Sequence, residues 1–262
     1  SVSGIIAEST PSNVKIMPIK VGDSAGSILT STFVVGVNYA QENGAHLINA
    51  SLGAPVESNV AFAAAIGRLE SQLRIPMICA AGNEGKSLDS INYFPAESTK
   101  TIAVAAIKDT GEKWAGSNSG SAIDFTAPGY RVKSYSKTGS LSGFKSGTSF
   151  AAPYITAVAA ILLTQNPSMS QSQLTEAMAN MCVDLGTPGK DDRFGYGYPK
   201  FNPKVKNGFE VENGKTYYYV NDEKIKGQKK IDDYWYMFDL NTGEMETSFY
   251  QHNSKSEEIE PI

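Results

Sequence analysis

Short, almost continuous apolar runs alternate with longer segments of mixed polarity along the first half of the chain. The apolar runs predict β-strands at Val14–Val21, His46–Leu52, Pro76–Ala81, Thr101–Ile107 and, more briefly, Asp124–Ala127. These runs lack the alternating polarity of a half-exposed strand, so we expect helices to cover both faces of the sheet. The pattern therefore predicts an α/β fold of three layers with a mostly parallel sheet in the middle.

Helical periodicity marks the segments between and after these strands. Apolar spacing predicts one helix from about Ile28 to just before Gly44, where glycine suits a left-handed helix end, and another over Val60–Leu73. A third segment, Phe150–Gln165, is apolar almost all round and is shorter than the roughly 20 residues that a bilayer requires. We interpret it as a buried core helix and expect no transmembrane segment.

The composition changes after about residue 202. Tyr217–Tyr219 and Tyr234–Tyr236 fall at a similar phase in two successive segments, each followed by a turn signal. This weak repeat predicts two β-hairpins. We therefore divide the chain of 262 residues into a domain over 1–204 and a small β-hairpin appendage over 205–262.

Charge and cysteine content narrow the function classes. The net charge is −4 and the basic residues form no stripe, which excludes nucleic acid as an expected partner. Cys79 lies in a predicted buried strand and Cys182 follows a helical segment, so both are interpreted as structural. Two cysteines do not decide the redox compartment.

A glycine-tight turn presents one serine at the start of the predicted core helix. By itself, Gly147-Thr148-Ser149 is typical of an ordinary helix cap. A serine peptidase needs such a nucleophile, donors for the oxyanion, a base and a group that orients the base. Ser149 at a helix N-terminus has free amides around it, and Asn83 at the end of a strand offers a second donor. These two residues are the predicted catalytic residues.

A base is harder to find, because the chain has only two histidines. His46 begins the strand that ends near Gly53, and at about 3.3 Å per residue it should lie roughly 20 Å from the functional end. His252 lies in a polar C-terminal segment. Neither is predicted to serve Ser149.

Together these motifs resemble the subtilisin-like serine peptidases over about residues 1–200. The segments that carry the resemblance, in the family's order and spacing, are Ile48–Gly53, Ala81–Asn83, Asp124–Gly129, Gly147–Pro153 and Gly195–Gly197. The resemblance implies hydrolysis of a peptide or protein substrate by Ser149, with Asn83 in the oxyanion hole. It implies substrate binding by Ser51, Leu52, Gly53, Ala80, Ala81, Gly82 and Thr148. The residues lining the floor of the substrate pocket come from loops such as Glu84–Phe94, whose shape the sequence does not predict.

The same comparison concerns the start of the chain. Ser1–Ala7, with apolar residues at helical spacing, resembles the stretch directly after the family's catalytic histidine. We therefore expect the triad histidine and aspartate to lie on a missing N-terminal segment. This segment would act as a partner of the chain, which should have almost no peptidase activity without it. Members of the family bind calcium, so calcium stays an open alternative, but we expect the usual strong-site loop to be absent here, and no cofactor or metal ligand is assigned. Asp89, Asp109 and Asp124 are interpreted as surface or capping residues.

Three functional hypotheses remain open. The leading one is the carboxyl-terminal part of a secreted or cell-surface serine endopeptidase, and its rival is a non-catalytic pseudoprotease of the same fold. The third gives priority to the appendage, which resembles the aromatic hairpin repeats of cell-wall modules that bind choline or glucan. The aromatic residues of this appendage could equally pack as a plain β-structure.

Overall fold

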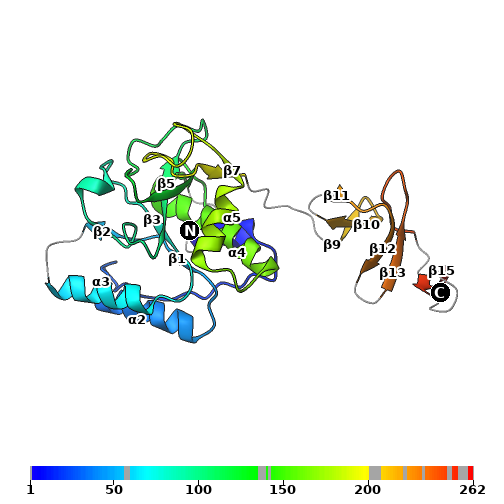
Figure 1. Cartoon of the computed structure of the whole chain (residues 1–262), viewed down its shortest axis with the longest axis horizontal. Coiled ribbons are helices and arrows are strands. Elements are labelled where there is room, and N and C mark those ends of the chain that lie inside the picture. Colours follow the sequence, from blue (N-terminus) through cyan, green and yellow to red (C-terminus); the bar gives the residue numbers. More distant parts are fainter. Residues whose placement is uncertain are drawn as a thin grey trace. The chain divides into compact units, whose positions relative to one another are not determined.

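The computed structural model describes residues 2–55, 60–134, 140, 143–200, 208–220, 223–231, 234–246, 250–252 and 259–261. The chain forms two compact units, Ser1–Phe201 and Asn202–Ile262, which we describe separately (Figure 1). The domain boundary predicted between residues 204 and 205 lies outside the described residues.

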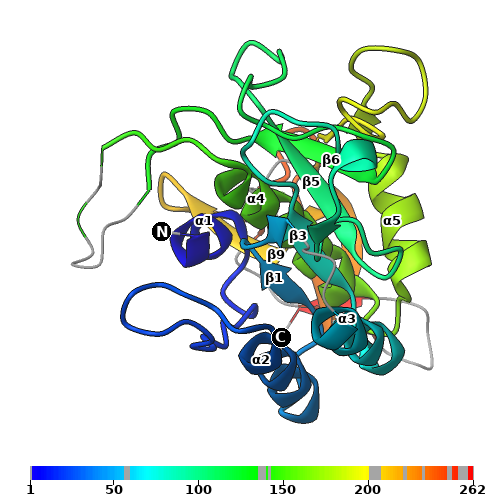
Figure 2. The ribbon, with the colours of Figure 1, turned by 90° about the vertical axis from the view of Figure 1, so that its left-hand side faces the viewer.

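A parallel sheet forms the middle layer of the larger unit. Among the described residues its strands are β1 (Ile48–Ala50), β3 (Met77–Ala80), β5 (Ile102–Ile107) and β6 (Ile123–Pro128), in this spatial order (Figure 2). Every residue of β3 and β5 is buried. The continuous apolar runs thus correctly predicted strands that are covered on both faces.

Helices cover the two faces of this sheet. Ile78 and Ala80 of β3 pack toward α4 (Thr148–Gln165) and α5 (Gln171–Ala179), whereas Cys79 packs toward α2 (Thr30–Glu42) and α3 (Val60–Gln72). Figure 1 shows α2 and α3 on one side of the sheet and α4 and α5 on the other. A further helix, α1 (Val2–Ser9), packs against α4. The predicted three-layer α/β fold is confirmed.

The helix α4 is the core helix that the sequence predicted. Ala151, Ile155 and Ala159 are completely buried. Within the described part of the chain, only this helix is long and apolar enough to cross a membrane, and 56% of it is buried inside the protein. Its apolar surface therefore serves the core of this unit.

The strand predicted at residues 14–21 is wrong. This segment lies outside every strand, and its residues 15–21 make no backbone hydrogen bond within the described chain. Val21 packs on α2, where a methyl group added at Gly36 would lie 2.5 Å from Val21 Cγ1, whereas Ile16 and Met17 are exposed. An apolar run alone does not make a strand, because a strand also requires a backbone partner.

Short elements complete the larger unit. The two-residue strands β2 (Ala54–Pro55) and β4 (Tyr93–Phe94) pair in antiparallel fashion. A second antiparallel pair joins β7 (Cys182–Val183) and β8 (Tyr198–Pro199). A 3-10 turn spans Leu88–Ser90. Both cysteines are free thiols, and burial raises the pKa of Cys182 to about 12, so a structural interpretation stands.

The smaller unit is built from β-hairpins. The strands β9 (Gly208–Glu212), β10 (Lys215–Val220) and β11 (Glu223–Lys224) form one sheet. The strands β12 (Gly227–Ile231), β13 (Tyr234–Phe238), β14 (Tyr250–His252) and β15 (Ile259–Pro261) form the other. The two aromatic triplets lie on β10 and β13, so the predicted hairpins are confirmed. The turn at Asn213 and Gly214, both with positive φ, suits a two-residue hairpin.

The core of the larger unit gives a first prediction. Phe125 is completely buried, with its ring centroid 5.7 Å from that of Tyr196. We expect Phe125→Ala to lower the free energy of unfolding by about 3–5 kcal/mol, because the substitution leaves a cavity. The matched control is Phe144→Ala, since Phe144 is 54% exposed and should cost under about 0.5 kcal/mol. Urea denaturation of both variants measures the difference, and equal losses would contradict this account of the core.

Candidate active site

Ser149 is the second residue of α4, immediately beyond the glycine turn. Its Oγ donates a hydrogen bond to the carbonyl oxygen of Ser51, at 3.0 Å, just after the end of β1. The Ser149 N–H has no partner among the described residues. The nucleophile predicted from the sequence therefore lies where the carboxyl end of a parallel strand meets the N-terminus of the core helix.

The side chain of Asn83 is fixed beside this serine by its own oxygen. Oδ1 accepts hydrogen bonds from the Thr148 N–H at 2.8 Å and from the Thr148 hydroxyl at 3.1 Å. The Gly82 N–H in turn donates to Thr148 Oγ1 at 3.0 Å. With Oδ1 held in this way, the Nδ2 amide of Asn83 has no partner among the described residues. Asn83 Nδ2 and the Ser149 N–H are thus two donors without a described partner at the start of α4, where Asn83 contacts Thr148, the residue before Ser149.

Two residues that sequence analysis did not identify brace the loop after β3. Glu84 Oε2 accepts hydrogen bonds from the Asn83 N–H at 2.9 Å and from Asn118 Nδ2 at 2.7 Å. Asn118 is completely buried and also donates to the Ala81 carbonyl at 2.9 Å. These contacts join loops that are distant in sequence, and the only local signal was a turn-like Asn-Glu-Gly run.

The two predicted substrate segments differ in what they offer a peptide. The Ala81 N–H donates to Val104, its carbonyl accepts from Asn118, and both backbone groups of Gly82 are likewise paired. The backbone groups of Leu52 and Gly53 make no hydrogen bond within the described part of the chain. An extended peptide can therefore form backbone hydrogen bonds with residues 52–53. Residues 80–82 can contact the peptide only by packing, because the backbone groups of Ala81 and Gly82 are already paired.

The histidines lie apart from this arrangement. His46 comes two residues before the amino end of β1, while Ser51 follows the carboxyl end of the same strand. His252 belongs to the smaller unit. Within the residues that the structure describes, no histidine is in a position to serve Ser149.

The acidic residues considered as metal ligands hold loops. Asp89 accepts hydrogen bonds from Ser87 and Ser121, and the Ser121 bonds lower the pKa of Asp89. Asp124 accepts from the Ala103 N–H at 2.9 Å and pairs with Lys190 at 3.0 Å, although its burial raises its pKa. No group of three or more possible ligands from His, Cys, Asp and Glu occurs in the described ranges.

With this geometry in place, comparison with known proteins identifies the family. The chain belongs to the subtilase family, whose model matches residues 2–197. Subtilisin DY of Bacillus licheniformis is 33% identical over 71% of this chain and 65% of its own length. Two Bacillus subtilis proteins, the minor extracellular protease Epr and a cell wall-associated protease, are each 31% identical. They match 73% and 72% of this chain but 29% and 22% of their own length.

Solved structures agree with this assignment. A cold-adapted subtilisin-like serine proteinase has a TM-score of 0.64 at 26% identity, covering 77% of this chain and 74% of the other. A lanthipeptide protease has a TM-score of 0.65 at 23% identity, which supports the fold alone. The chain spans less than two thirds of the length of the curated relatives named above.

Proposed function

We propose that this chain is the nucleophile-bearing part of a subtilisin-like serine endopeptidase. Ser149 attacks the scissile carbonyl, and the oxyanion is held by Asn83 Nδ2 and the Ser149 N–H. The observation that carries the proposal is the pair of unused donors at the start of α4, where Asn83 is fixed on Thr148 and the next residue is Ser149. A pseudoprotease would have no use for an asparagine whose oxygen is fixed so that its amide stays free.

The histidine and aspartate of the triad come, in this proposal, from a partner segment. Support comes from a cavity of about 1220 Å³ beside β1, lined by residues of α1, α2, β1, α4 and the segment 13–19. Within the described residues, β1 pairs only with β3, and residues 15–21 on the facing wall have no backbone partner. Two walls with unpaired backbone and apolar side chains suit an inserted β-strand. The partner is therefore an apolar strand that brings the base with it.

Complementation tests this function. We would co-express the chain with the polypeptide encoded directly upstream of Ser1 and call the purified pair the complemented protein. The expected result is cleavage of a fluorogenic peptide by the complemented protein and by neither part alone. A complex that forms, raises the melting temperature and cleaves no peptide would contradict the proposal. An upstream sequence without histidine and aspartate would favour the pseudoprotease.

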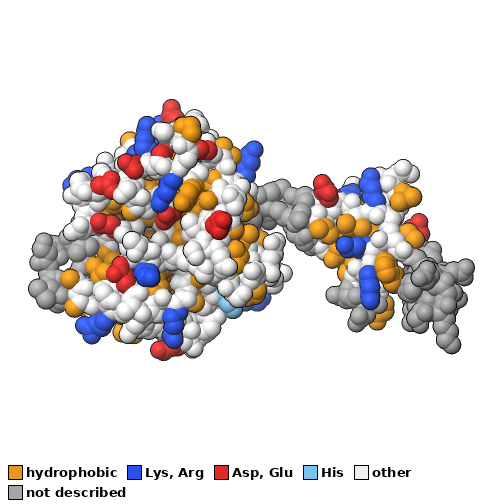
Figure 3. Space-filling view, viewed as in Figure 1, with side chains coloured by type: hydrophobic (Ala, Val, Ile, Leu, Met, Phe, Trp, Pro, Cys, Tyr) orange, Lys and Arg blue, Asp and Glu red, His pale blue; other side chains and the backbone are white. Residues whose placement is uncertain are grey.

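Charge and relatives bear on where such an enzyme works. On the visible face of the larger unit, acidic and basic side chains are interspersed (Figure 3). Two relatives are described as extracellular and as cell wall-associated. We propose a secreted or cell-surface location for this protein, with a protein or peptide substrate.

A second function, binding to cell-wall carbohydrate, is proposed for the smaller unit. Phe209 is 43% exposed, and its ring lies 4.9 Å from Tyr218 and 5.0 Å from Tyr236. Tyr217 and Tyr219, in contrast, are buried, so the two outer rings of that triplet are not available for stacking. The Phe209 cluster is the surface that favours a sugar, because exposed rings stack on apolar sugar faces. A pull-down on insoluble peptidoglycan, with and without residues 206–262, tests this function.

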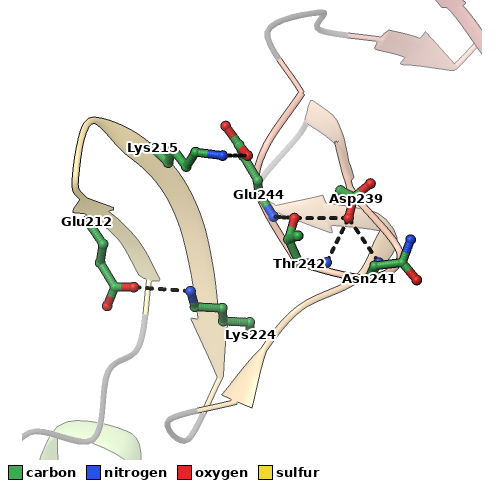
Figure 4. A network of polar contacts seen from close by, with 7 residues as sticks. All are labelled: Glu212, Lys215, Lys224, Asp239, Asn241, Thr242 and Glu244. Carbon is green, nitrogen blue, oxygen red and sulfur yellow. Dashed lines mark hydrogen bonds and ion pairs between the residues drawn. The ribbon is translucent and has the colours of Figure 1, made fainter.

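Choline is disfavoured because a lysine already occupies the cation position. The Lys224 ammonium lies 3.3 Å from the ring centroid of Tyr217 and 5.7 Å from that of Tyr219. Glu212 fixes it in an ion pair of 3.1 Å, beside the Lys215–Glu244 pair and the turn held by Asp239 (Figure 4). Because Lys224 lies over these buried rings, we expect Lys224→Ala to uncover them and raise retention on choline resin about tenfold. The control is Lys215→Ala, and equal retention of both variants would contradict the assignment.

A further inference from the structure

Tyr93 lies under the junction of the two predicted substrate segments. The antiparallel bridge between β4 and β2 brings it there, and its side chain is only 4% exposed. A methyl group added at Gly53 would lie 2.6 Å from Tyr93 Cε1, and one added at Gly82 would lie 2.6 Å from Cζ. The ring therefore spans the space between residues 51–53 and residues 80–82, and both glycines are needed for it to fit.

Polar contacts fix this ring at two points. The Tyr93 hydroxyl is hydrogen-bonded to the Glu84 carboxylate, and the Tyr93 N–H donates to Glu97 Oε2 at 2.7 Å. Burial, together with the negative charge of Glu84, raises the pKa of Tyr93 to about 12, so the hydroxyl stays a neutral donor. Glu84 is held in turn by the Asn83 N–H and Asn118. Displacing the ring would therefore leave the Glu84 carboxylate with one donor fewer.

The position of the ring determines which side chain can lie before the scissile bond. Ser149 Oγ lies 3.0 Å from the Ser51 carbonyl, and Gly53 is two residues further along the same segment. In an extended peptide, alternate side chains point to opposite faces. The side chain attached to the attacked carbonyl would therefore point between Gly53 and Gly82, where the Tyr93 ring already fills the space.

We propose that Tyr93 closes this subsite and restricts the residue on the acyl side of the cleaved bond to glycine, alanine or serine. This inference rests on the proposed function for its reaction, but the subsite can be tested by binding alone. The Tyr93 ring would exclude large side chains of the peptide by steric hindrance. One large side chain on the acyl side of the cleaved bond should therefore lower the affinity of the chain for the peptide by at least about tenfold.

The binding test uses N-acetyl tetrapeptide acids that differ only in a C-terminal alanine or phenylalanine. We expect the chain to bind the alanine peptide at least about tenfold more tightly, measured by NMR titration. Tyr93→Gly and Tyr93→Ala should reverse this preference, whereas Tyr93→Phe should keep it. Equal binding of both peptides, no binding of either, or an unchanged preference in the glycine and alanine variants would overturn the proposal.

A matched control separates the subsite from general damage to the fold. Phe94 is the neighbouring buried ring and packs edge-on against Phe33, at 6.1 Å between centroids. We expect Phe94→Ala to lower the melting temperature as Tyr93→Ala does, yet to retain the preference for alanine. A reversal in Phe94→Ala as well would show that loosening of the loop, and not the Tyr93 ring, sets the preference.

Cleavage assays then distinguish this inference from the proposed function. If the complemented protein cleaves the alanine series and the glycine variant cleaves the phenylalanine series, both stand. If binding shows the preference but nothing is cleaved, the endopeptidase proposal fails and the subsite remains. If cleavage ignores the side chain, the function stands and the role of Tyr93 is refuted.

Discussion

Ser149→Ala will lower peptide hydrolysis by the complemented protein about a millionfold. The alanine has no oxygen to attack the carbonyl, so only the oxyanion donors and substrate binding remain. The magnitude is the one known for subtilisin itself, a member of the same family, where loss of the serine costs about 10⁶ in kcat and about 10³–10⁴ over water remains. Single-turnover hydrolysis of a fluorogenic peptide, with the partner strand saturating, measures the loss.

The control for this prediction lies in the same turn. Ser146 Oγ accepts a hydrogen bond from the Arg131 N–H at 3.0 Å and makes no hydrogen bond to Ser149 within the described residues. Ser146→Ala should retain hydrolysis within about tenfold, and both variants should bind the partner strand equally. Activity of Ser149→Ala above about a thousandth of the wild type would mean that another group is the nucleophile.

The apolar pattern predicted most of the fold because it reports side-chain burial. Residues 76–81 and 101–107 were predicted as strands, and both segments are buried between two helical layers as β3 and β5. Residues 14–21 are also apolar in sequence, but they form no strand, and only part of the segment packs on α2 while Ile16 and Met17 are exposed. Pairing depends on a neighbouring strand, which periodicity within one segment cannot report.

In the candidate site, too, some residues could be predicted from the sequence and others could not. Ser149 and Asn83 could be predicted because each stands beside a glycine at the end of a regular element, where such residues commonly carry chemistry. The loop Glu84–Phe94 was expected to line the pocket, but the contacts of Glu84, Asn118 and Tyr93 could not be predicted, because they join segments up to 40 positions apart, as between Gly53 and Tyr93. In the smaller unit, alternation along β10 buries Tyr217 and Tyr219 and leaves Tyr218 partly exposed, so composition alone overestimated the exposed aromatic surface.

Asn83→Ala will lower kcat of the complemented protein by about 10²–10³ with little change in KM. The Nδ2 amide has no partner in the resting site, so its hydrogen bond forms only when the carbonyl oxygen becomes an oxyanion. The size of the effect is again taken from subtilisin, where it was measured for the corresponding kind of donor. Steady-state kinetics on one peptide at several concentrations separates the two parameters.

The outcome of that substitution also tests why the asparagine is oriented as it is. Asn83→Ala removes the acceptor of the Thr148 N–H as well, so a structural effect must be distinguished from a chemical one. Asn83→Asp keeps that acceptor but replaces the free amide by a carboxylate oxygen, which repels an oxyanion. The Asn83→Asp variant should therefore be at least as inactive as Asn83→Ala, while keeping the melting temperature of the wild type. The control is Asn92→Ala, at an exposed position, which should behave as the wild type. A rise in KM with unchanged kcat in either Asn83 variant would place this side chain in ground-state binding and remove it from the oxyanion hole.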